Sequence, residues 1–259
     1  MSEYLQTALT AALGCRYPIV QTAMGWVADA NLVIASTRAG AFGFLAGATL
    51  AADKLEAEIQ RVIEATGGSN FGLNFHMFQE NAAQCVDLAI EYRLRAVSYG
   101  RGPDRQTIER FKKAGVLCIP TVGALKHAIK AVELGADMIT VQGGEGGGHT
   151  GGVPSTILLP QVLDAVQVPV IAAGGYSTGR GLAGALATGA AGIAMGTRFL
   201  MTQESPTPIA TLERYVKVAD PQKIRVTLAV DGMRHRMIEN AFINRLEKAS
   251  AFGRLRIAL

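Results

Sequence analysis

The strongest constraint on the fold is an alternation of short apolar runs with helical patterns that repeats eight times. In the segment at 52–65, for example, Leu55, Ile59, Val62 and Ile63 recur at helical spacing. Continuous apolar strands that alternate with helices are typical of a parallel sheet covered by helices. The predicted strands lie at 17–21, 41–45, 70–75, 96–99, 116–120, 138–141, 168–173 and 191–195. The predicted helices lie at 32–39, 52–65, 81–92, 105–114, 124–134, 159–165, 180–188 and 209–218.

Eight such units predict an α/β fold of the closed (β/α)8 TIM-barrel type. The alternative is a doubly wound open sheet, which would normally place its glycine fingerprint after the first strand. Here the glycine-rich and polar segments follow the sixth, seventh and eighth predicted strands. The position of these segments therefore favours the barrel.

The pattern changes at Asp220, which we take as the boundary between two parts of the chain. Residues 223–232 alternate like a strand or an extended arm, and residues 237–248 have the spacing of a helix. We predict a barrel at 1–219 and a C-terminal appendage at 220–259 that packs on it. The end of the chain, 254–259, has no obvious closing element.

Charge and cysteine usage exclude several classes of protein. The formal charge is only +4 and the charges are interspersed, which argues against a dedicated nucleic-acid surface. Cys15, Cys85 and Cys118 lie far apart and form no CxxC pair, so we expect free thiols, no metal site and a reducing cytoplasm. The longest weakly polar run, 182–196, is too short to span a bilayer. We expect a small-molecule substrate, with neither nucleic acid nor membrane as partner. A homodimer is compatible with the sequence.

A glycine-rich segment at 141–152 is the most unusual stretch of the chain. Seven of its twelve residues are glycine, so its backbone can approach a bound group closely. It also carries Glu145 and His149. His149 is our candidate general base because imidazole titrates near neutral pH. The alternatives are a mobile loop with an incidental histidine and, for Glu145, a solvated carboxylate, a substrate contact or a loop contact.

The loops after two further predicted strands have residues typical of phosphate binding. Gly174 and Gly175 follow the seventh strand, and Gly196 and Thr197 follow the eighth. In (β/α)8 enzymes these two loops commonly bind phosphate through backbone N–H groups. Each pair alone would also suit an ordinary βα connection, so the prediction rests on their occurrence together.

Polar residues at other predicted strand ends allow two interpretations. Gln21 and Asn74 end the first and third strands, where their amides could read the edge of a flavin pyrimidine ring or merely satisfy loop backbone groups. Of the remaining histidines, we expect His127 to be a surface or packing residue. His76 and His235 are retained as minor functional candidates.

Five motifs resemble those of the nitronate monooxygenase (2-nitropropane dioxygenase) family. They lie at 18–24, 72–75, 142–151, 170–175 and 195–199, and the resemblance runs from about residue 15 to residue 245. It implies a barrel that binds FMN without a covalent link and uses His149 as the catalytic base. The residues implied to bind the cofactor are Ala23, Met24, Asn74, Gln142, Gly147, Gly148, Gly174, Gly175, Gly196 and Thr197.

Two features depart from the nitronate enzymes. The first loop reads Gln-Thr-Ala-Met, where a proline before the methionine is more usual. The segment 230–236, Val-Asp-Gly-Met-Arg-His-Arg, is closer to a subgroup of flavin-dependent oxidoreductases that act on CoA thioesters in steroid ring degradation.

The function predicted from the sequence is therefore an FMN-dependent oxidoreductase that oxidises nitronates or nitroalkanes with O2. One alternative is an NAD(P)H-linked flavin enzyme that acts on a CoA thioester. In that case the CoA phosphates would meet Arg101, Arg105, Arg198, Arg234 or Arg236. Further alternatives are an enoyl-acyl-carrier-protein reductase and a non-catalytic barrel that binds FMN or phosphate.

Overall fold

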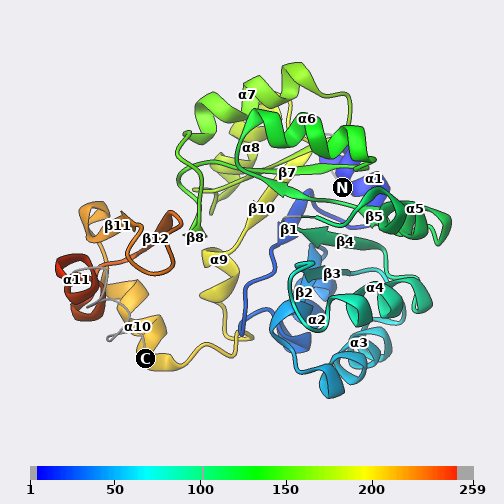
Figure 1. Cartoon of the computed structure of the whole chain (residues 1–259), viewed down its shortest axis with the longest axis horizontal. Coiled ribbons are helices and arrows are strands. Elements are labelled where there is room, and N and C mark those ends of the chain that lie inside the picture. Colours follow the sequence, from blue (N-terminus) through cyan, green and yellow to red (C-terminus); the bar gives the residue numbers. More distant parts are fainter. Residues whose placement is uncertain (1–4, 101, 250–259) are drawn as a thin grey trace.

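A single curled sheet of parallel strands forms the centre of the molecule (Figure 1). The computed structural model describes residues 5–100 and 102–249. The strand order is β5-β4-β3-β2-β1-β10-β9-β7-β6, and the neighbouring strands are parallel. The strands are β1 Ile19–Gln21, β2 Phe42–Ala46, β3 Gly72–Phe75, β4 Ala96–Tyr99, β5 Leu117–Cys118, β6 Thr121–Val122, β7 Ile139–Gln142, β9 Val170–Ala173 and β10 Gly192–Met195.

The two ends of this strand order belong to one stretch of chain, which closes the sheet. Only Ile119 and Pro120 separate β5 from β6. Ile119 N donates to the Val97 carbonyl in β4 at 2.8 Å, and Thr140 N in β7 donates to the Pro120 carbonyl at 2.9 Å. Pro120 has no N–H of its own, which accounts for the break between the two short strands. The predicted (β/α)8 barrel is confirmed.

Seven helices follow the barrel strands and cover the outside of the sheet (Figure 1). They are α2 Ala30–Arg38, α3 Ala52–Thr66, α4 Ala82–Glu91, α5 Arg105–Lys113, α6 Leu125–Leu134, α7 Ser155–Ala165 and α8 Gly179–Thr188. Asp29 caps α2, as its position predicts, by accepting a hydrogen bond from Leu32 N at 3.0 Å.

The barrel interior is filled by side chains from the strands and from a helix that sequence analysis did not predict. This helix, α1 (Ala8–Leu13), begins at Thr7 with a capping box. Leu9 and Leu13 are fully buried and pack in one core cluster with Phe42, Phe44 and Ile171. With only six residues, α1 is too short to show a clear helical period.

Helix α7 begins four residues before the predicted start at Leu159. Pro160 lies inside α7, whereas the prediction placed it in the first turn, where proline is favoured. The proline removes one N–H donor from the middle of the helix but does not end it. The earlier start is stabilised by Glu145, whose carboxylate binds the first residue of α7.

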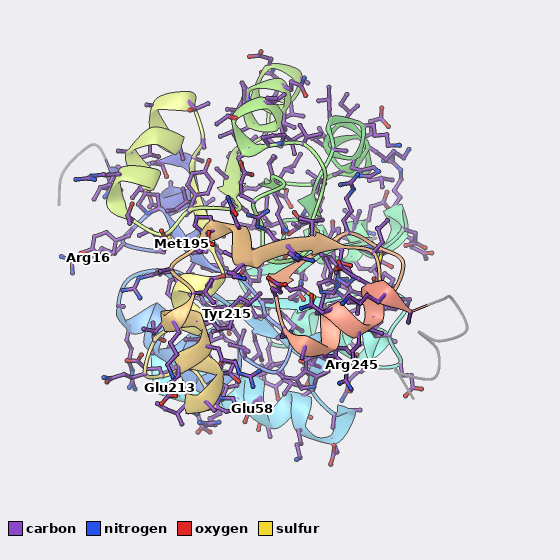
Figure 2. All side chains as sticks on the ribbon, turned by 90° about the vertical axis from the view of Figure 1, so that its left-hand side faces the viewer. Arg16, Glu58, Met195, Glu213, Tyr215 and Arg245 are labelled. Atoms are coloured by element: carbon purple, nitrogen blue, oxygen red, sulfur yellow. The ribbon has the colours of Figure 1, made fainter. Side chains whose placement is uncertain are left out.

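The predicted eighth helix forms, but it is not buried in the barrel wall. Helix α10 (Ile209–Lys217) has no buried residue, and Ile209 and Val216 are 74% and 72% exposed. A short helix, α9 (Thr197–Leu200), precedes it directly after β10. Figure 2, which views the left-hand side of Figure 1, shows α10 with Glu213 and Tyr215 among the C-terminal elements in front of the barrel.

The C-terminal segment forms a small antiparallel sheet with the glycine-rich loop. The strand order in this sheet is β11 (Ile224–Thr227), β12 (His235–Ile238) and β8 (Gly148–His149). Along the chain, helix α11 (Ala241–Lys248) follows β12. The predicted helix at 237–248 therefore starts too early, because Met237 and Ile238 pair with Arg225 and Ile224 in the sheet. The boundary between barrel and appendage stays a prediction, and 254–259 lie outside the described residues.

The cysteines agree with the expectation of free thiols. Cys15, Cys85 and Cys118 are all unpaired, and burial raises the pKa of Cys85 to about 12. Within residues 5–100 and 102–249, no helix has both the length and the apolar character that crossing a membrane requires.

Candidate functional site

The glycine-rich loop between β7 and α7 is folded back on itself. Gly144 N donates to the Val153 carbonyl at 2.8 Å, and the Thr150 hydroxyl donates to the Gly143 carbonyl at 3.1 Å. Glu145 accepts from both the Ser155 amide, at 3.0 Å, and the Ser155 hydroxyl, at 2.7 Å. Burial opposes ionisation of Glu145, but these hydrogen bonds outweigh it and its pKa is lowered. Glu145 is thus a loop contact that anchors the loop to α7.

Close packing explains some of the glycines in this loop. A methyl group placed on Gly143 would lie 2.5 Å from Ser155 N, and one on Gly146 would overlap the side chain of Gln142. The next loop is equally tight, since a methyl group on Gly174 would lie 3.0 Å from Gly146 N. The glycines at these positions let the loops after β7 and β9 touch through their backbones.

His149 is held by two independent contacts from the C-terminal segment. As part of β8 it pairs in antiparallel register with His235 of β12. Its Nε2 lies 2.6 Å from Asp231 Oδ2. Asp231 is itself fixed, because its Oδ1 accepts a hydrogen bond from Met233 N at 3.0 Å. The hydrogen bonds from His149 and from the Met233 amide lower the pKa of Asp231.

This contact decides which nitrogen of His149 can act as a base. An ionised carboxylate can only accept hydrogen bonds, so the proton of a neutral His149 lies on Nε2. Nδ1 then carries the lone pair that can accept a proton. The carboxylate also stabilises the imidazolium formed after that transfer.

His235 completes a cluster that the sequence did not reveal. Its ring centroid is 4.1 Å from that of His149, and its Nδ1 is 3.9 Å from Asp231 Oδ2. One ligand atom from each of His149, Asp231 and His235 lies within 4.8 Å of the others, a grouping that could hold a metal ion. No metal site was expected from the sequence. The 2.6 Å contact of His149 with Asp231 has the length of a hydrogen bond.

The pKa of His235 predicts how stability depends on pH. Burial, and then the nearby His149, lower it, so the folded protein binds fewer protons here than the unfolded chain. The stability contribution is therefore fully present above the unfolded pKa of about 6.5 and is lost as the pH falls from that value through the lower folded pKa. We expect the melting temperature to fall as the pH drops below about 6.5, and His235→Gln to flatten this fall. His127→Gln, which removes an exposed histidine, is the control; equal slopes for both variants would refute the assignment.

A large cavity opens beside His149. It has a volume of about 590 Å³, within the range of small-molecule sites. Gln142 and His149 line it, and the Gln142 amide donates to the His149 carbonyl at 2.8 Å. His127, expected to be a surface or packing residue, lines it with Lys130. The apolar part of the wall consists of Tyr99, Pro103, Ile108, Pro120, Val122, Ala131 and Leu134.

Several of the residues predicted to bind the cofactor meet at the same end of the barrel. Because β1 pairs with β10, a methyl group on Gly196 would lie 3.5 Å from Met24 Sδ. A methyl group on Gly147 would lie 3.8 Å from the Thr197 hydroxyl. Gly174 and Gly175 both have positive φ, at 93° and 80°. Gly148 also has positive φ and, like Gly147, belongs to the loop that carries His149.

Asn74 and Gln21 bind backbone groups, which was the second interpretation of each. Asn74 Nδ2 donates to the Ser98 carbonyl at 3.0 Å. Gln21 is fully buried and donates to the carbonyls of Thr22 and Phe44. Asn74 lies on β3, two strands away from β1, and Ala23 packs beside Met24 in the loop after β1. Outside this cluster, His76 Nδ1 contacts the Gly100 carbonyl at 3.0 Å.

Comparison with known proteins gives one family. The sequence profile described as nitronate monooxygenase matches residues 6–92 and 78–254. A protein of Mycobacterium tuberculosis is 49% identical over 95% of this chain and 70% of its own length. A protein of Rhodococcus jostii is 48% identical over 94% of this chain and 68% of its own. Both bear the name (3aS,4S,5R,7aS)-5-hydroxy-7a-methyl-1-oxo-octahydro-1H-indene-4-carboxyl-CoA dehydrogenase.

A solved structure agrees with the sequence matches. FabK from Thermotoga maritima superposes with a TM-score of 0.91 at 31% identity, covering 97% of this chain and 80% of that protein. The likeness extends beyond the barrel strands to nearly the whole of the chain.

Proposed function

The chain belongs to the nitronate monooxygenase family of flavin-dependent oxidoreductases, and within it we propose an FMN-dependent dehydrogenase that oxidises a ring hydroxyl of a CoA thioester. The observation that carries this proposal is the cavity of about 590 Å³ with His149 in its wall. Its largely apolar lining suits a fused-ring acyl group better than a small nitroalkane. The names of the two relatives near half identity point to the same substrate class.

The loops at the end of the barrel fit a flavin mononucleotide. The consecutive left-handed glycines Gly174 and Gly175 leave their backbone free of side chains, as a phosphate-binding turn requires. Gly196 and Thr197 would share the phosphate with them. Met24 beside Gly196, and Gln142 beside His149, would border the ring system.

In this reaction the substrate loses two electrons and two protons. The hydroxyl proton passes to Nδ1 of His149, and a carbon–oxygen double bond forms as the carbinol C–H bond breaks. A bound flavin would supply the two-electron acceptor for the hydrogen that leaves carbon with the electron pair. Asp231 stabilises the imidazolium throughout, and Gln142 fixes the His149 backbone.

The test is anaerobic stopped-flow absorbance of the FMN-loaded protein. We would mix it separately with the hydroxylated indene-carboxyl-CoA thioester, with a nitronate, and with NADH or NADPH. We expect the thioester to bleach the flavin. Fast bleaching by the nitronate, with the thioester inert, would instead support the monooxygenase that the family name describes.

A further inference from the structure

The structure separates the five arginines that were candidates for CoA phosphates. Arg101 lies outside the described residues. Arg105 donates to the Glu133 carbonyl at 2.9 Å, and Arg198 lies in α9. Of the four candidate arginines that the structure describes, Arg234 and Arg236 line one pocket together.

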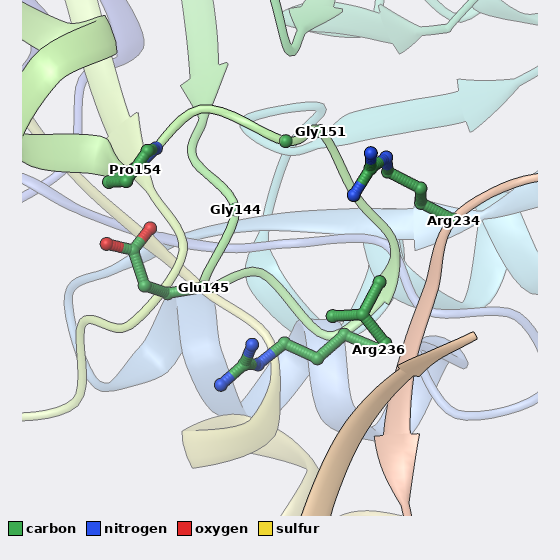
Figure 3. Close-up of a pocket in the computed structure, with 8 residues that line it drawn as sticks. Gly144, Glu145, Gly151, Pro154, Arg234 and Arg236 are labelled. Carbon is green, nitrogen blue, oxygen red and sulfur yellow. The ribbon is translucent and has the colours of Figure 1, made fainter.

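The arginine pocket has a volume of about 250 Å³ and lies against the glycine-rich loop (Figure 3). The two arginines share it because alternate residues along an extended segment point to the same side. Arg236 pairs with Gly148, which has no side chain, and Thr150 N donates to the Arg234 carbonyl at 3.0 Å. The lining residues are Gly144, Glu145, Gly151, Gly152, Pro154, Val226, Arg234 and Arg236.

The charge of this pocket is not balanced from within. In the described part of the chain, neither Arg234 nor Arg236 forms an ion pair. Arg225, on the neighbouring strand β11, pairs with both Glu239 and Glu247. Glu145 is the one carboxylate of the lining; Arg236 lies near enough to help lower its pKa, but the carboxylate already accepts hydrogen bonds from Ser155. Two guanidinium charges therefore face one carboxylate charge, and the excess positive charge can bind an external anion.

We propose that the arginine pocket binds the phosphate or diphosphate group of a ligand whose reactive part occupies the large cavity. Gly151 lines both spaces, so the two adjoin at this residue, and the proposed ligand extends across it from His149 to the two arginines. Guanidinium groups bind phosphate oxygens through paired, charge-assisted hydrogen bonds. The identity of the ligand rests on the proposed function. Its source is the CoA carrier of a thioester or the diphosphate of a nicotinamide dinucleotide.

The test is calorimetric titration of the FMN-loaded protein with inorganic pyrophosphate, coenzyme A and NADPH. We expect Arg234→Gln/Arg236→Gln to weaken pyrophosphate binding about tenfold or more. The matched control is Arg214→Gln/Arg245→Gln. It removes the same charge from exposed arginines of α10 and α11, outside the pocket. We expect affinity within about twofold of the parent, since distant exposed charges are screened.

A conservative variant separates charge from geometry. Arg234→Lys/Arg236→Lys keeps both charges but loses the planar fork, so we expect intermediate affinity. Bound FMN and the melting temperature report that each variant is folded. The titrations with coenzyme A and NADPH identify the natural ligand. The ligand whose affinity falls in parallel with that of pyrophosphate is the one whose phosphate binds to the arginine pocket.

The subsite is refuted if the parent binds no pyrophosphate, or if the pocket and control variants weaken binding equally. If the binding of pyrophosphate and NADPH depends on both arginines but coenzyme A does not bind, the subsite is supported and the CoA thioester function is refuted. If the pocket variant oxidises the thioester and binds coenzyme A with full affinity, the function is supported and the subsite is refuted.

Discussion

His149→Ala is expected to retain bound flavin but to reduce it about 10²- to 10⁴-fold more slowly with the thioester, the usual contribution of a general base. The fold should survive because β8 joins β12 through backbone pairing, which alanine preserves. The residues assigned to the phosphate, Gly174, Gly175, Gly196 and Thr197, lie on other loops. Anaerobic stopped-flow absorbance measures the rate, and the visible spectrum measures the flavin.

The control for this variant is His127→Ala. His127 lines the same cavity from α6 but has no carboxylate partner among the described residues. We expect an unchanged reduction rate at saturating substrate, with any effect confined to KM. A second check is rescue of His149→Gly by added imidazole. Full-speed reduction by His149→Ala would show that another group takes the proton.

The barrel could be predicted because its signals are local. Strand β4 spans Ala96–Tyr99 as predicted, since all four of its residues are buried and only Ser98 among them is polar. Positive-φ glycines mark the ends of α3, α6 and α8 where the helical pattern stops. Helices that depend on distant partners were placed less well. Helix α7 starts early because Glu145, ten residues upstream of Ser155, anchors its first turn.

The centre of the candidate site shows the limit of sequence reasoning most clearly. His149 could be identified from its setting among glycines, but Asp231 could not, because 82 residues separate the two. Their contact depends on the pairing of β12 with β8, and β8 is only two residues long. In addition, Met237 and Ile238 fit both the helical pattern and the strand that they form. The only sequence feature that indicated the importance of this region was the Val-Asp-Gly-Met-Arg-His-Arg segment. It resembles one subgroup of the family, but the resemblance gave no role to the aspartate.

Asp231→Asn should be almost as damaging as loss of His149, although the side chain hardly changes in size. An asparagine amide can donate a hydrogen bond to Nε2, which favours the tautomer with the proton on Nδ1. That nitrogen then has no lone pair for the substrate proton. We expect flavin reduction to slow about 10²- to 10⁴-fold with flavin content unchanged.

The matched control is Asp220→Asn. Asp220 Oδ1 accepts from the amide two residues ahead, Gln222 N at 2.9 Å, just as Asp231 Oδ1 accepts from Met233 N. It has no histidine partner in the described chain, so Asp220→Asn exchanges a carboxylate for an amide in an equivalent turn without a change at the base. We expect its reduction rate to match that of the parent. A loss shared by both variants would show that the effect does not depend on the contact with His149.

The tautomer itself can be observed, which distinguishes positioning from a purely structural role. Long-range 1H–15N correlation spectra of the neutral His149 ring should place the proton on Nε2 in the parent and on Nδ1 in Asp231→Asn. A structural role would lower the melting temperature and leave the tautomer unchanged. A slow variant whose proton stays on Nε2 would therefore contradict the mechanism. A variant with the proton on Nδ1 and an undiminished rate would show that His149 accepts no proton in catalysis.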